Sequence, residues 1–279
     1  MTKILVTGAS GFIGKHLILK LCNSNSNIIE STRSDGDIAE KSTWSSFERA
    51  DVVIHLAGST FVPDSWNNPD AFMRTNFHGT VCALEYCRQH GAKLVFLSSY
   101  LYGNPNTLPT PESAVLIANN PYGLSKKLAE EVCKFYADYY GLKITILRPF
   151  NVYGPGQPAQ FLIPSIINQV RLGGIISIKQ LEPKRDYIFV EDLVDAIIKA
   201  SAAQLDFNVF NIGTGVNHSV GDLIDMIQNI MGTNLPVMAT GETRVEEIME
   251  TQAEITRAYS VLGWVPRYSL FAGLQKLVS

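Results

Sequence analysis

The first fourteen residues restrict the fold more than any other stretch of the chain. Residues 3–6 form a short apolar run that predicts a buried strand, and three glycines follow at three-residue intervals. Apolar residues then recur at helical spacing over 12–22. Strand, glycine turn and helix in this order are typical of a βαβ unit whose helix start meets the phosphates of a dinucleotide. From this run we expect the following residues at a cofactor: Gly8, Ser10, Gly11, Phe12, Ile13 and Gly14.

The composition is that of an ordinary globular protein. Of the 279 residues, 46% are hydrophobic and 18% are charged, and the formal net charge is −3. This balance favours neither a nucleic-acid partner nor a membrane partner. The four cysteines have no ligand spacing, so we expect no metal site, and for the two that lie in helical patterns we expect buried thiols. Because the chain begins with a strand and has no apolar run of about 18 residues, we expect no signal peptide, no membrane span and a reduced, cytoplasmic location.

Strand and helix patterns alternate over the first two-thirds of the chain. Strands are predicted at 28–32, 52–56, 94–97 and 144–148, and helices at 12–22, 68–90 and 122–140. This alternation predicts an α/β fold, a Rossmann-type doubly wound parallel sheet. We expect residues 1–150 to form the cofactor domain. We expect residues 151–279 to form mainly a smaller α/β substrate lobe, with some segments returning to the large sheet. Helices at 161–171, 193–203 and 220–231 and strands at 175–178 and 209–212 are predicted there.

The end of the second strand bears on the choice of cofactor. An acidic residue about 18 residues after the last glycine usually binds the ribose 2′-hydroxyl of NAD, but Thr32 and Arg33 stand there. A hydroxyl and a guanidinium suit a 2′-phosphate, so we expect NADP(H) to be preferred. NAD(H) stays the alternative if Arg33 is a surface arginine and Asp35 or Glu30 binds the ribose. Two further residues, Asp37 and Ile38, are candidates for the adenine.

The ends of the third and fourth strands supply further candidates, because parallel sheets bind ligands at their carboxyl edge. Small residues at Leu56-Ala57-Gly58 permit a cofactor against the backbone, whereas the buried His55 before them is more simply structural. Thr60 lies in the loop that follows, and Asn76 lies within the 68–90 helix. The fourth strand ends in Ser98 and Ser99, whose hydroxyls suit a substrate carbonyl or hydroxyl and are equally common in turns.

Tyr122 and Lys126 stand four residues apart at the start of the 122–140 helix, where one side chain lies above the other. A cation beside a phenol lowers its pKa and makes the phenol a general acid or base. The pair lies off the apolar stripe of the helix, which we take to be its core face. That stripe consists of Leu124, Leu128, Val132, Phe135 and Tyr139.

Taken in order, these motifs resemble the extended short-chain dehydrogenase/reductase superfamily, within it the NAD-dependent epimerase/dehydratase family acting on nucleotide sugars. The resemblance covers nearly the whole chain. It rests on the glycine run, His55 to Gly58, Asn76, Ser98, Tyr122 with Lys126, 147–156, 185–192, 210–215 and 262–266. It implies a nucleotide-diphosphate sugar as substrate and a homodimer paired through the helices at 68–90 and 122–140.

The resemblance also implies residue roles. Tyr122 transfers the proton of the sugar oxygen, and Lys126 holds the nicotinamide ribose and acidifies Tyr122. Ser98, five residues before Gly103, matches the catalytic Ser or Thr, and Ser99 is the neighbouring candidate if the register differs by one. Further matches are Phe150 near the nicotinamide and Asn151 and Arg185 at the sugar-nucleotide phosphates. Arg244 is a further phosphate candidate, and its alternative is a solvated surface residue.

Two departures from the family pattern narrow the reaction. Family dehydratases carry an Asp-Glu pair directly after the catalytic Ser or Thr, whereas Ser99 and Tyr100 stand there, which argues against a 4,6-dehydratase. Arg33 favours an exchangeable NADPH, and with it a reductase that transfers hydride to carbon 4 of a nucleotide-linked 4-keto-hexose. The alternative is a 4-epimerase with tightly bound NAD. A non-catalytic NADP(H)-binding protein is disfavoured, because it would need neither serine, tyrosine nor lysine at these positions.

Overall fold

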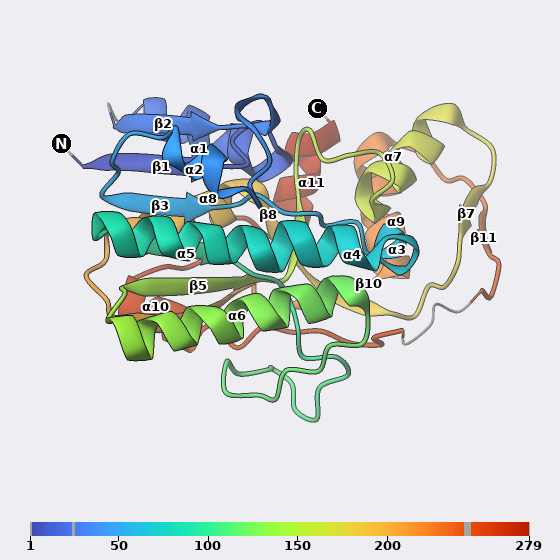
Figure 1. Cartoon of the computed structure of the whole chain (residues 1–279). Coiled ribbons are helices and arrows are strands. Elements are labelled where there is room, and N and C mark those ends of the chain that lie inside the picture. Colours follow the sequence, from blue (N-terminus) through green and yellow to red (C-terminus); the bar gives the residue numbers. More distant parts are fainter. Residues whose placement is uncertain (1, 24–25, 243–246, 279) are drawn as a thin grey trace.

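The computed structural model describes residues 2–23, 26–242 and 247–278. The described strands include a six-stranded sheet in the order β2-β1-β3-β4-β5-β9, in which all neighbours are parallel (Figure 1). Its strands are β1 (Lys3–Thr7), β2 (Asn27–Ser31), β3 (Val52–His55), β4 (Lys93–Leu97), β5 (Ile144–Pro149) and β9 (Phe207–Ile212). The strand order reverses between β1 and β3, and ligands bind in the crevice at such a point. The predicted doubly wound α/β fold is confirmed, and the first five strands lie within one residue of their predicted bounds.

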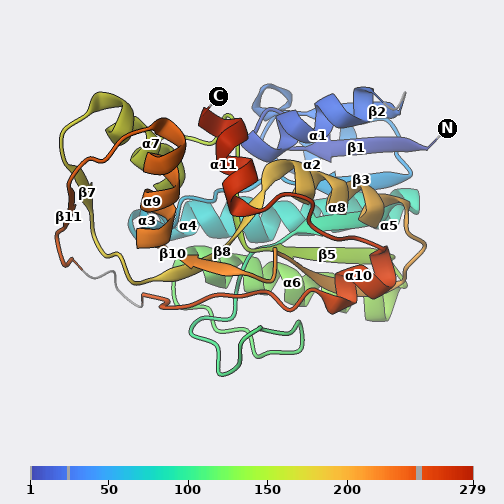
Figure 2. The ribbon, with the colours of Figure 1, turned by 180° about the vertical axis from the view of Figure 1, so that it is seen from behind.

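Helices cover both faces of this sheet. One face carries α2 (Lys41–Ser45), α5 (Gly79–His90) and α6 (Pro121–Tyr140), and Figure 1 is viewed from this side. The opposite face, seen in Figure 2, carries α1 (Phe12–Cys22), α8 (Val190–Ala202) and α10 (Thr256–Leu262). Successive strand residues point to opposite faces, so Ile4 and Val6 pack under α1 and α8 whereas Leu5 packs toward α5. The alternating layers keep the strands buried and leave their carboxyl ends open to a ligand.

The predicted helix at 68–90 is interrupted. It consists of α4 (Pro69–Phe72), a π-helical turn η2 (Met73–His78) and α5. Within the turn, the buried Asn76 amide bonds the backbone of Ser59 and the hydroxyl of Ser125. Extra residues in a helical turn of this kind often mark functional positions. The interruption therefore joins this helix to the loop after β3.

The smaller lobe has a core of its own, formed by α7 (Leu162–Leu172), α9 (Val220–Met231) and α11 (Leu270–Val278). The described residues here also form two small sheets, β10-β8-β6 and β11-β7. Their strands are β6 (Asn151–Tyr153), β7 (Ile176–Ile178), β8 (Lys184–Phe189), β10 (Asn217–Ser219) and β11 (Val237–Ala239). Figure 1 shows this lobe beyond the carboxyl ends of the large sheet, and the chain returns to that sheet through α8 and β9. The remaining elements are the short helices η1 (Arg33–Asp35) and α3 (Val62–Asn67).

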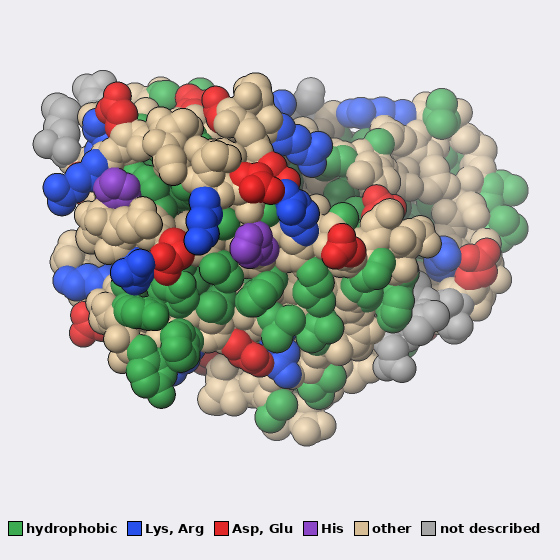
Figure 3. All heavy atoms as spheres, in the orientation of Figure 1, with side chains coloured by type: hydrophobic (Ala, Val, Ile, Leu, Met, Phe, Trp, Pro, Cys, Tyr) green, Lys and Arg blue, Asp and Glu red, His purple; other side chains and the backbone are tan. Residues whose placement is uncertain are grey.

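The predicted core stripe of α6 is wrong. Leu124, Phe135 and Tyr139 are 41%, 48% and 74% exposed, and they contribute to an apolar band over α5 and α6 (Figure 3). The face that packs inward carries small and polar side chains, among them Ser125, Lys126, Ala129, Glu130 and Cys133. The larger apolar side chains of the helix therefore point outward, and the face that carries Lys126 and Glu130 packs toward the sheet. Within the described ranges no helix is both long and apolar enough to cross a bilayer.

Candidate active site

The glycine turn after β1 forms a cradle that only glycine can line. Gly8 has a φ of +70°, and a Cβ there would lie 2.8 Å from the Ala57 nitrogen. A Cβ on Gly14 would lie 2.2 Å from the Gly8 carbonyl oxygen, so strand and helix approach closely. The first turn of α1 follows Gly11 and has no side-chain cap, which leaves its N–H groups for an anion. These features fit the diphosphate of a dinucleotide, with Ser10 exposed and Phe12 and Ile13 half-buried at the helix start.

A hydrogen bond to Thr7 of β1 holds the loop after β3 in place. The Ala57 amide donates to Thr7 Oγ1 (3.2 Å), which also contacts His55 Nδ1 (2.8 Å). Burial and the charge of Lys126 lower the pKa of His55 to about 3, so this histidine is neutral and packs between rings. A Cβ on Gly58 would lie 2.9 Å from Asn76 Oδ1. Asn76 therefore shapes the half-buried run Leu56-Ala57-Gly58, and its amide is already engaged by protein groups.

The end of β2 presents both signs of charge. Asp35 accepts hydrogen bonds from the amide and hydroxyl of Thr32 (2.7 and 2.9 Å), and these bonds lower the Asp35 pKa. Arg33 is exposed beside them. Asp37 is also exposed, but its carboxylate accepts from the Ala39 amide and from Arg74, which binds Glu40 as well. The predicted adenine contact at Asp37 and the half-buried Ile38 therefore involves a carboxylate that Arg74 already holds.

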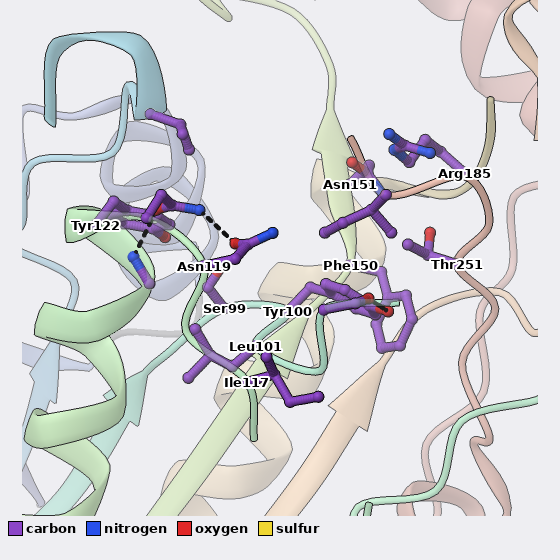
Figure 4. A pocket seen from close by; sticks show the side chains of 15 residues that line it. Ser99, Tyr100, Leu101, Ile117, Asn119, Tyr122, Phe150, Asn151, Arg185 and Thr251 are labelled. Atoms are coloured by element: carbon purple, nitrogen blue, oxygen red, sulfur yellow. Dashed lines mark hydrogen bonds between the residues drawn. The ribbon is translucent and has the colours of Figure 1, made fainter. Parts of the chain in front are cut away.

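A cavity opens between the carboxyl ends of β4 and β5 and the smaller lobe (Figure 4). In Figure 4, Ser99 and Tyr122 lie at one end of the cavity, and Asn151 and Arg185 lie at the other. Its described lining consists of Val62, Ser99, Tyr100, Leu101, Gly103, Ile117, Asn119, Asn120, Tyr122, Gly123, Phe150, Asn151, Arg185, Ile248 and Thr251.

Tyr122 is the acid–base candidate at the Ser99 end of the cavity. Burial raises the pKa of the Tyr122 phenol, and its hydrogen bond with the Ser99 hydroxyl works in the opposite direction. The phenol therefore holds its proton at neutral pH, and Ser99 lines the same cavity. This pair has the composition needed to bind and protonate one substrate oxygen.

Ser98, the predicted catalytic serine, lies outside the described lining of the cavity. Its amide still pairs with Leu147 of β5 (2.8 Å), and its buried hydroxyl donates to Glu130 Oε1 (2.5 Å). Consecutive residues at a strand end point to opposite sides, so Ser98 faces α6 and Ser99 faces the cavity. The spacing of five residues before Gly103 pointed to Ser98, whose amide continues the hydrogen bonding of β4 with β5. The dehydratase argument is unaffected, since residues 98–103 contain no carboxylate.

A buried polar network receives the Ser98 hydroxyl. Glu130 of α6 pairs with Arg148 of β5 (2.6 Å), and both side chains are at least nine-tenths buried. Arg148 also donates to the Tyr102 hydroxyl (2.8 Å) and the Glu112 carbonyl (3.0 Å). The network thus ties α6, β5 and the 99–120 loop together behind the cavity, and it fixes the peptide that precedes Ser99.

Lys126 differs from its predicted role in one respect. Its ammonium donates to the Leu97 carbonyl (2.7 Å) and lies 4.7 Å from the centre of the Phe96 ring. Burial lowers the pKa of Lys126 to about 8, and the Glu130 carboxylate works against that shift. The shift of Tyr122 has burial and Ser99 as its causes, so the predicted acidification of Tyr122 by Lys126 is not seen in this arrangement.

The end of the cavity opposite Tyr122 carries the predicted phosphate residues. Asn151 Nδ2 donates to the Asp186 carbonyl (3.2 Å), and Arg185 pairs with Glu247 (2.5 Å). Phe150 lines the wall and contacts the Tyr100 ring edge to face, 5.0 Å between centres. Thr60 is exposed in the loop after β3 and is not part of the described lining. Arg244 lies outside the described residues.

Several residues of the site gave no sequence signal of their own. Arg148 lies at the end of a predicted strand, and a buried arginine needs an acidic partner. That requirement was the available signal for Glu130, which follows Lys126 by one helical turn. Ile117, Asn119 and Glu247 come from loops without periodicity. Their positions depend on tertiary contacts rather than on local pattern.

The comparisons with known proteins agree with this arrangement. The family model "NAD dependent epimerase/dehydratase family" matches residues 4–213. The chain belongs to this family. The family expected from the sequence is therefore confirmed, and with it an enzyme that uses NAD(H) or NADP(H).

Members with different reactions are similar to this chain over nearly its full length. It is 27% identical to the GDP-6-deoxy-D-mannose reductase of Pseudomonas aeruginosa, covering 99% of this chain and 96% of that protein. The crystal structure of UDP-glucose 4-epimerase from Thermotoga maritima with UDP-glucose has a TM-score of 0.92 at 30% identity, covering 99% of this chain and 97% of that one. The structure of RMD from P. aeruginosa with NADPH has a TM-score of 0.92 at 27% identity, covering 100% and 98%.

Proposed function

We propose that this chain reduces carbon 4 of a nucleotide-linked 4-keto-hexose, with NADPH as the preferred hydride donor. The observation that carries the proposal is a cavity with Ser99 and Tyr122 at one end and Asn151 and Arg185 at the other. Such a cavity suits a substrate with a reacting oxygen at one end and a diphosphate at the other. Similarity to a sugar-nucleotide reductase and to an epimerase is consistent with chemistry at carbon 4.

The residues divide the reaction between them. The glycine cradle and the start of α1 would hold the cofactor diphosphate, and Lys126 would hold the nicotinamide ribose. When bound, the nicotinamide supplies a hydride to carbon 4. As the carbonyl becomes an alkoxide, Tyr122 donates its proton to that oxygen and Ser99 stabilises the developing charge. The raised pKa of Tyr122 suits this direction, because the phenol arrives protonated.

Residues at both ends of the cavity position the sugar. Arg185 offers its guanidinium to the diphosphate in place of Glu247, and Asn151 offers a polar group beside it. Positioning carbon 4 of the sugar against the hydride donor provides much of the rate acceleration. General acid catalysis by Tyr122 adds a further factor of about 10²–10⁴.

A 4-epimerase with bound NAD is the second candidate, and one observation favours it. The Asp35 carboxylate lies at Thr32, where a carboxylate disfavours a 2′-phosphate. Arg33 beside it favours the phosphate, and on this ground we place the reductase first.

The proposal is tested by adding an NDP-4-keto-hexose to the purified protein with NADPH or NADH and following the loss of the reduced nicotinamide. We expect oxidation that depends on the sugar and is faster with NADPH. Interconversion of UDP-glucose and UDP-galactose without added cofactor, and no oxidation of NADPH, would establish the epimerase instead.

We also infer that the chain pairs with a second copy through α5 and α6. Apolar side chains of the α6 face are exposed along its length: Leu124 is 41%, Phe135 48%, Tyr139 74% and Tyr140 53% exposed. Figure 3 shows a band of apolar side chains over α5 and α6. Contiguous apolar surface of this kind is typical of interfaces.

A further inference from the structure

Arg185 is the one charged side chain among the described residues that line the cavity. It lies on β8, at the end opposite Ser99 and Tyr122 (Figure 4). Its Nη1 donates to the Lys184 carbonyl (2.9 Å), and its Nη2 donates to Glu247 Oε1 (2.5 Å). The two side chains of this ion pair are only 15% and 14% exposed, so solvent and salt screen their attraction weakly.

The segment that carries Glu247 is held from two sides. Asn104 of the 99–120 loop donates through Nδ2 to the Glu247 carbonyl (3.4 Å) and accepts from the Met249 amide (3.1 Å). On the side of β8, the Lys184 amide donates to the Met249 carbonyl (2.8 Å) and the Thr251 amide donates to the Lys184 carbonyl (3.1 Å). These backbone contacts place the Glu247 carboxylate beside the guanidinium without the help of a ligand.

The Glu247 carboxylate stands where an anionic ligand would need positive charge. Bidentate binding of a phosphate uses two N–H groups of a guanidinium, and Glu247 takes part of that donor set. It also cancels the charge of Arg185, so the described lining at this end offers no net attraction to an anion. A diphosphate beside an intact ion pair would meet a like charge in a pocket that water screens poorly.

We propose that Glu247 is a built-in competitor for Arg185, which the diphosphate of the sugar nucleotide displaces when it binds. This inference rests on the proposed function and concerns what sets the affinity of that same site. Glu247 weakens the binding of the sugar nucleotide and favours its release. When the ligand leaves, the carboxylate returns to the guanidinium, so Arg185 is not left as an uncompensated buried charge.

The test uses Glu247→Gln, which keeps the shape of the side chain and removes its charge. The Kd values of UDP, GDP and dTDP are measured by calorimetry, with NADP⁺ or NAD⁺ present to fill the cofactor site. For each nucleotide that binds, we expect the Kd to fall about 10- to 100-fold in the variant, the effect of one hydrogen bond to a charged group. A purely structural role of Glu247 predicts the opposite direction, because a distorted site binds less tightly.

A matched control separates this effect from a general loss of negative charge. Glu250→Gln removes the same charge from the same segment, but the Glu250 carboxylate accepts from Asn217 Nδ2 (2.8 Å) instead of from Arg185. Its Kd values should stay within about twofold of those of the unmodified protein.

A double-mutant cycle shows whether Glu247 acts through Arg185. In an Arg185→Met background, Glu247→Gln should no longer tighten binding, because the group for which the carboxylate competes is absent. Glu247→Asp keeps the charge on a shorter side chain and should give an intermediate Kd. It carries the test if Glu247→Gln does not fold.

The outcomes separate this inference from the proposed function. An unchanged or higher Kd in the Glu247 variants would overturn the competitor and leave the proposed reductase standing, and so would an equal gain in Glu250→Gln or in the Arg185→Met background. Failure of both the unmodified protein and the Glu247 variants to bind any of the three nucleotides would overturn the competitor together with the nucleotide-sugar substrate. Binding by the Glu247 variants alone would support both.

Discussion

Ser98 and Ser99 are adjacent in the chain, but one contacts a buried polar network and the other lines the cavity. The Ser98 hydroxyl is buried against Glu130, whereas Ser99 lines the cavity together with Tyr122. The alternation of side chains along an extended strand separates them. A register difference of one residue therefore changes which serine acts on the substrate.

Alanine at each serine tests this assignment. Ser99→Ala should lower kcat by about 10- to 1,000-fold with little change in cofactor affinity, because it removes a donor from the developing oxyanion. Ser98→Ala should keep kcat within about threefold and cost roughly 1 kcal/mol of unfolding free energy through one lost hydrogen bond. Turnover and urea unfolding measure both. Loss of activity in Ser98→Ala at unchanged stability, with Ser99→Ala active, would return the role to Ser98.

Arg33 is the residue whose charge should select the cofactor. Arg33→Ser should weaken NADPH binding by about 10- to 100-fold and leave NADH binding nearly unchanged, since a charge-assisted hydrogen bond contributes roughly 1.5–3 kcal/mol. Fluorescence titration of the two reduced nucleotides provides the measurement, with the exposed Arg171→Ser as the control. A parallel loss of both affinities would show that Arg33 does not read the 2′-phosphate.

At the scale of elements, α6 carries two unrelated functions on its two sides. Its inner side brings Tyr122 to the cavity, joins Lys126 to the Leu97 carbonyl and pairs Glu130 with Arg148 of β5. A buried pair of this kind contributes little relative to apolar residues, but removing one partner leaves the other charge uncompensated. The pair also fixes the peptide before Ser99, so both stability and catalysis depend on it.

Glu130→Gln should reduce the free energy of unfolding by about 3–5 kcal/mol. It should also lower the pKa of Lys126 further, because Glu130 raises that pKa toward its ordinary value. The alkaline limb of the kcat/KM profile, if set by Lys126, would then move to lower pH, a change that lost stability alone does not produce. Asp138→Asn breaks the exposed pair with Lys134 on the same helix and should cost less than about 1 kcal/mol. An unmoved pH profile in Glu130→Gln would limit Glu130 to a structural role.

The sequence predicted the elements whose pattern is local. The strands β1 to β5 are short apolar runs bounded by polar residues, and the glycine turn admits few other conformations, so both were located nearly to the residue. The faces of α6 could not be assigned, because an apolar stripe looks the same whether it packs on a sheet or lies exposed. The π turn around Asn76 depends on the distant Ser59 and Ser125, which no periodicity shows. For the same reason Tyr122 and Lys126 were found as a motif, whereas Glu130 and Ile117 were not.

At the scale of the whole molecule, the apolar band over α5 and α6 is the surface that a second copy should cover. Phe135 stacks against Tyr139 (4.7 Å between ring centres) in the middle of exposed aromatic side chains. Phe135→Asp places a charge there, so we expect the dimer to dissociate to monomer with an unchanged fold. Light scattering after size-exclusion chromatography measures the mass, and Leu172→Asp, at a position 86% exposed on α7, is the control. A monomeric unmodified protein, or an unchanged mass in Phe135→Asp, would contradict the proposed interface.

The most direct test of the central claim is the nucleotide that the purified protein carries. A reductase must exchange its cofactor in every turnover, whereas an epimerase regenerates it within the site. The protein should be denatured after gel filtration and the released nucleotide identified and counted per chain. The account predicts much less than one nucleotide per chain and tight uptake of added NADPH over NADH. Stoichiometric NAD that survives gel filtration would contradict it and establish a self-recycling epimerase.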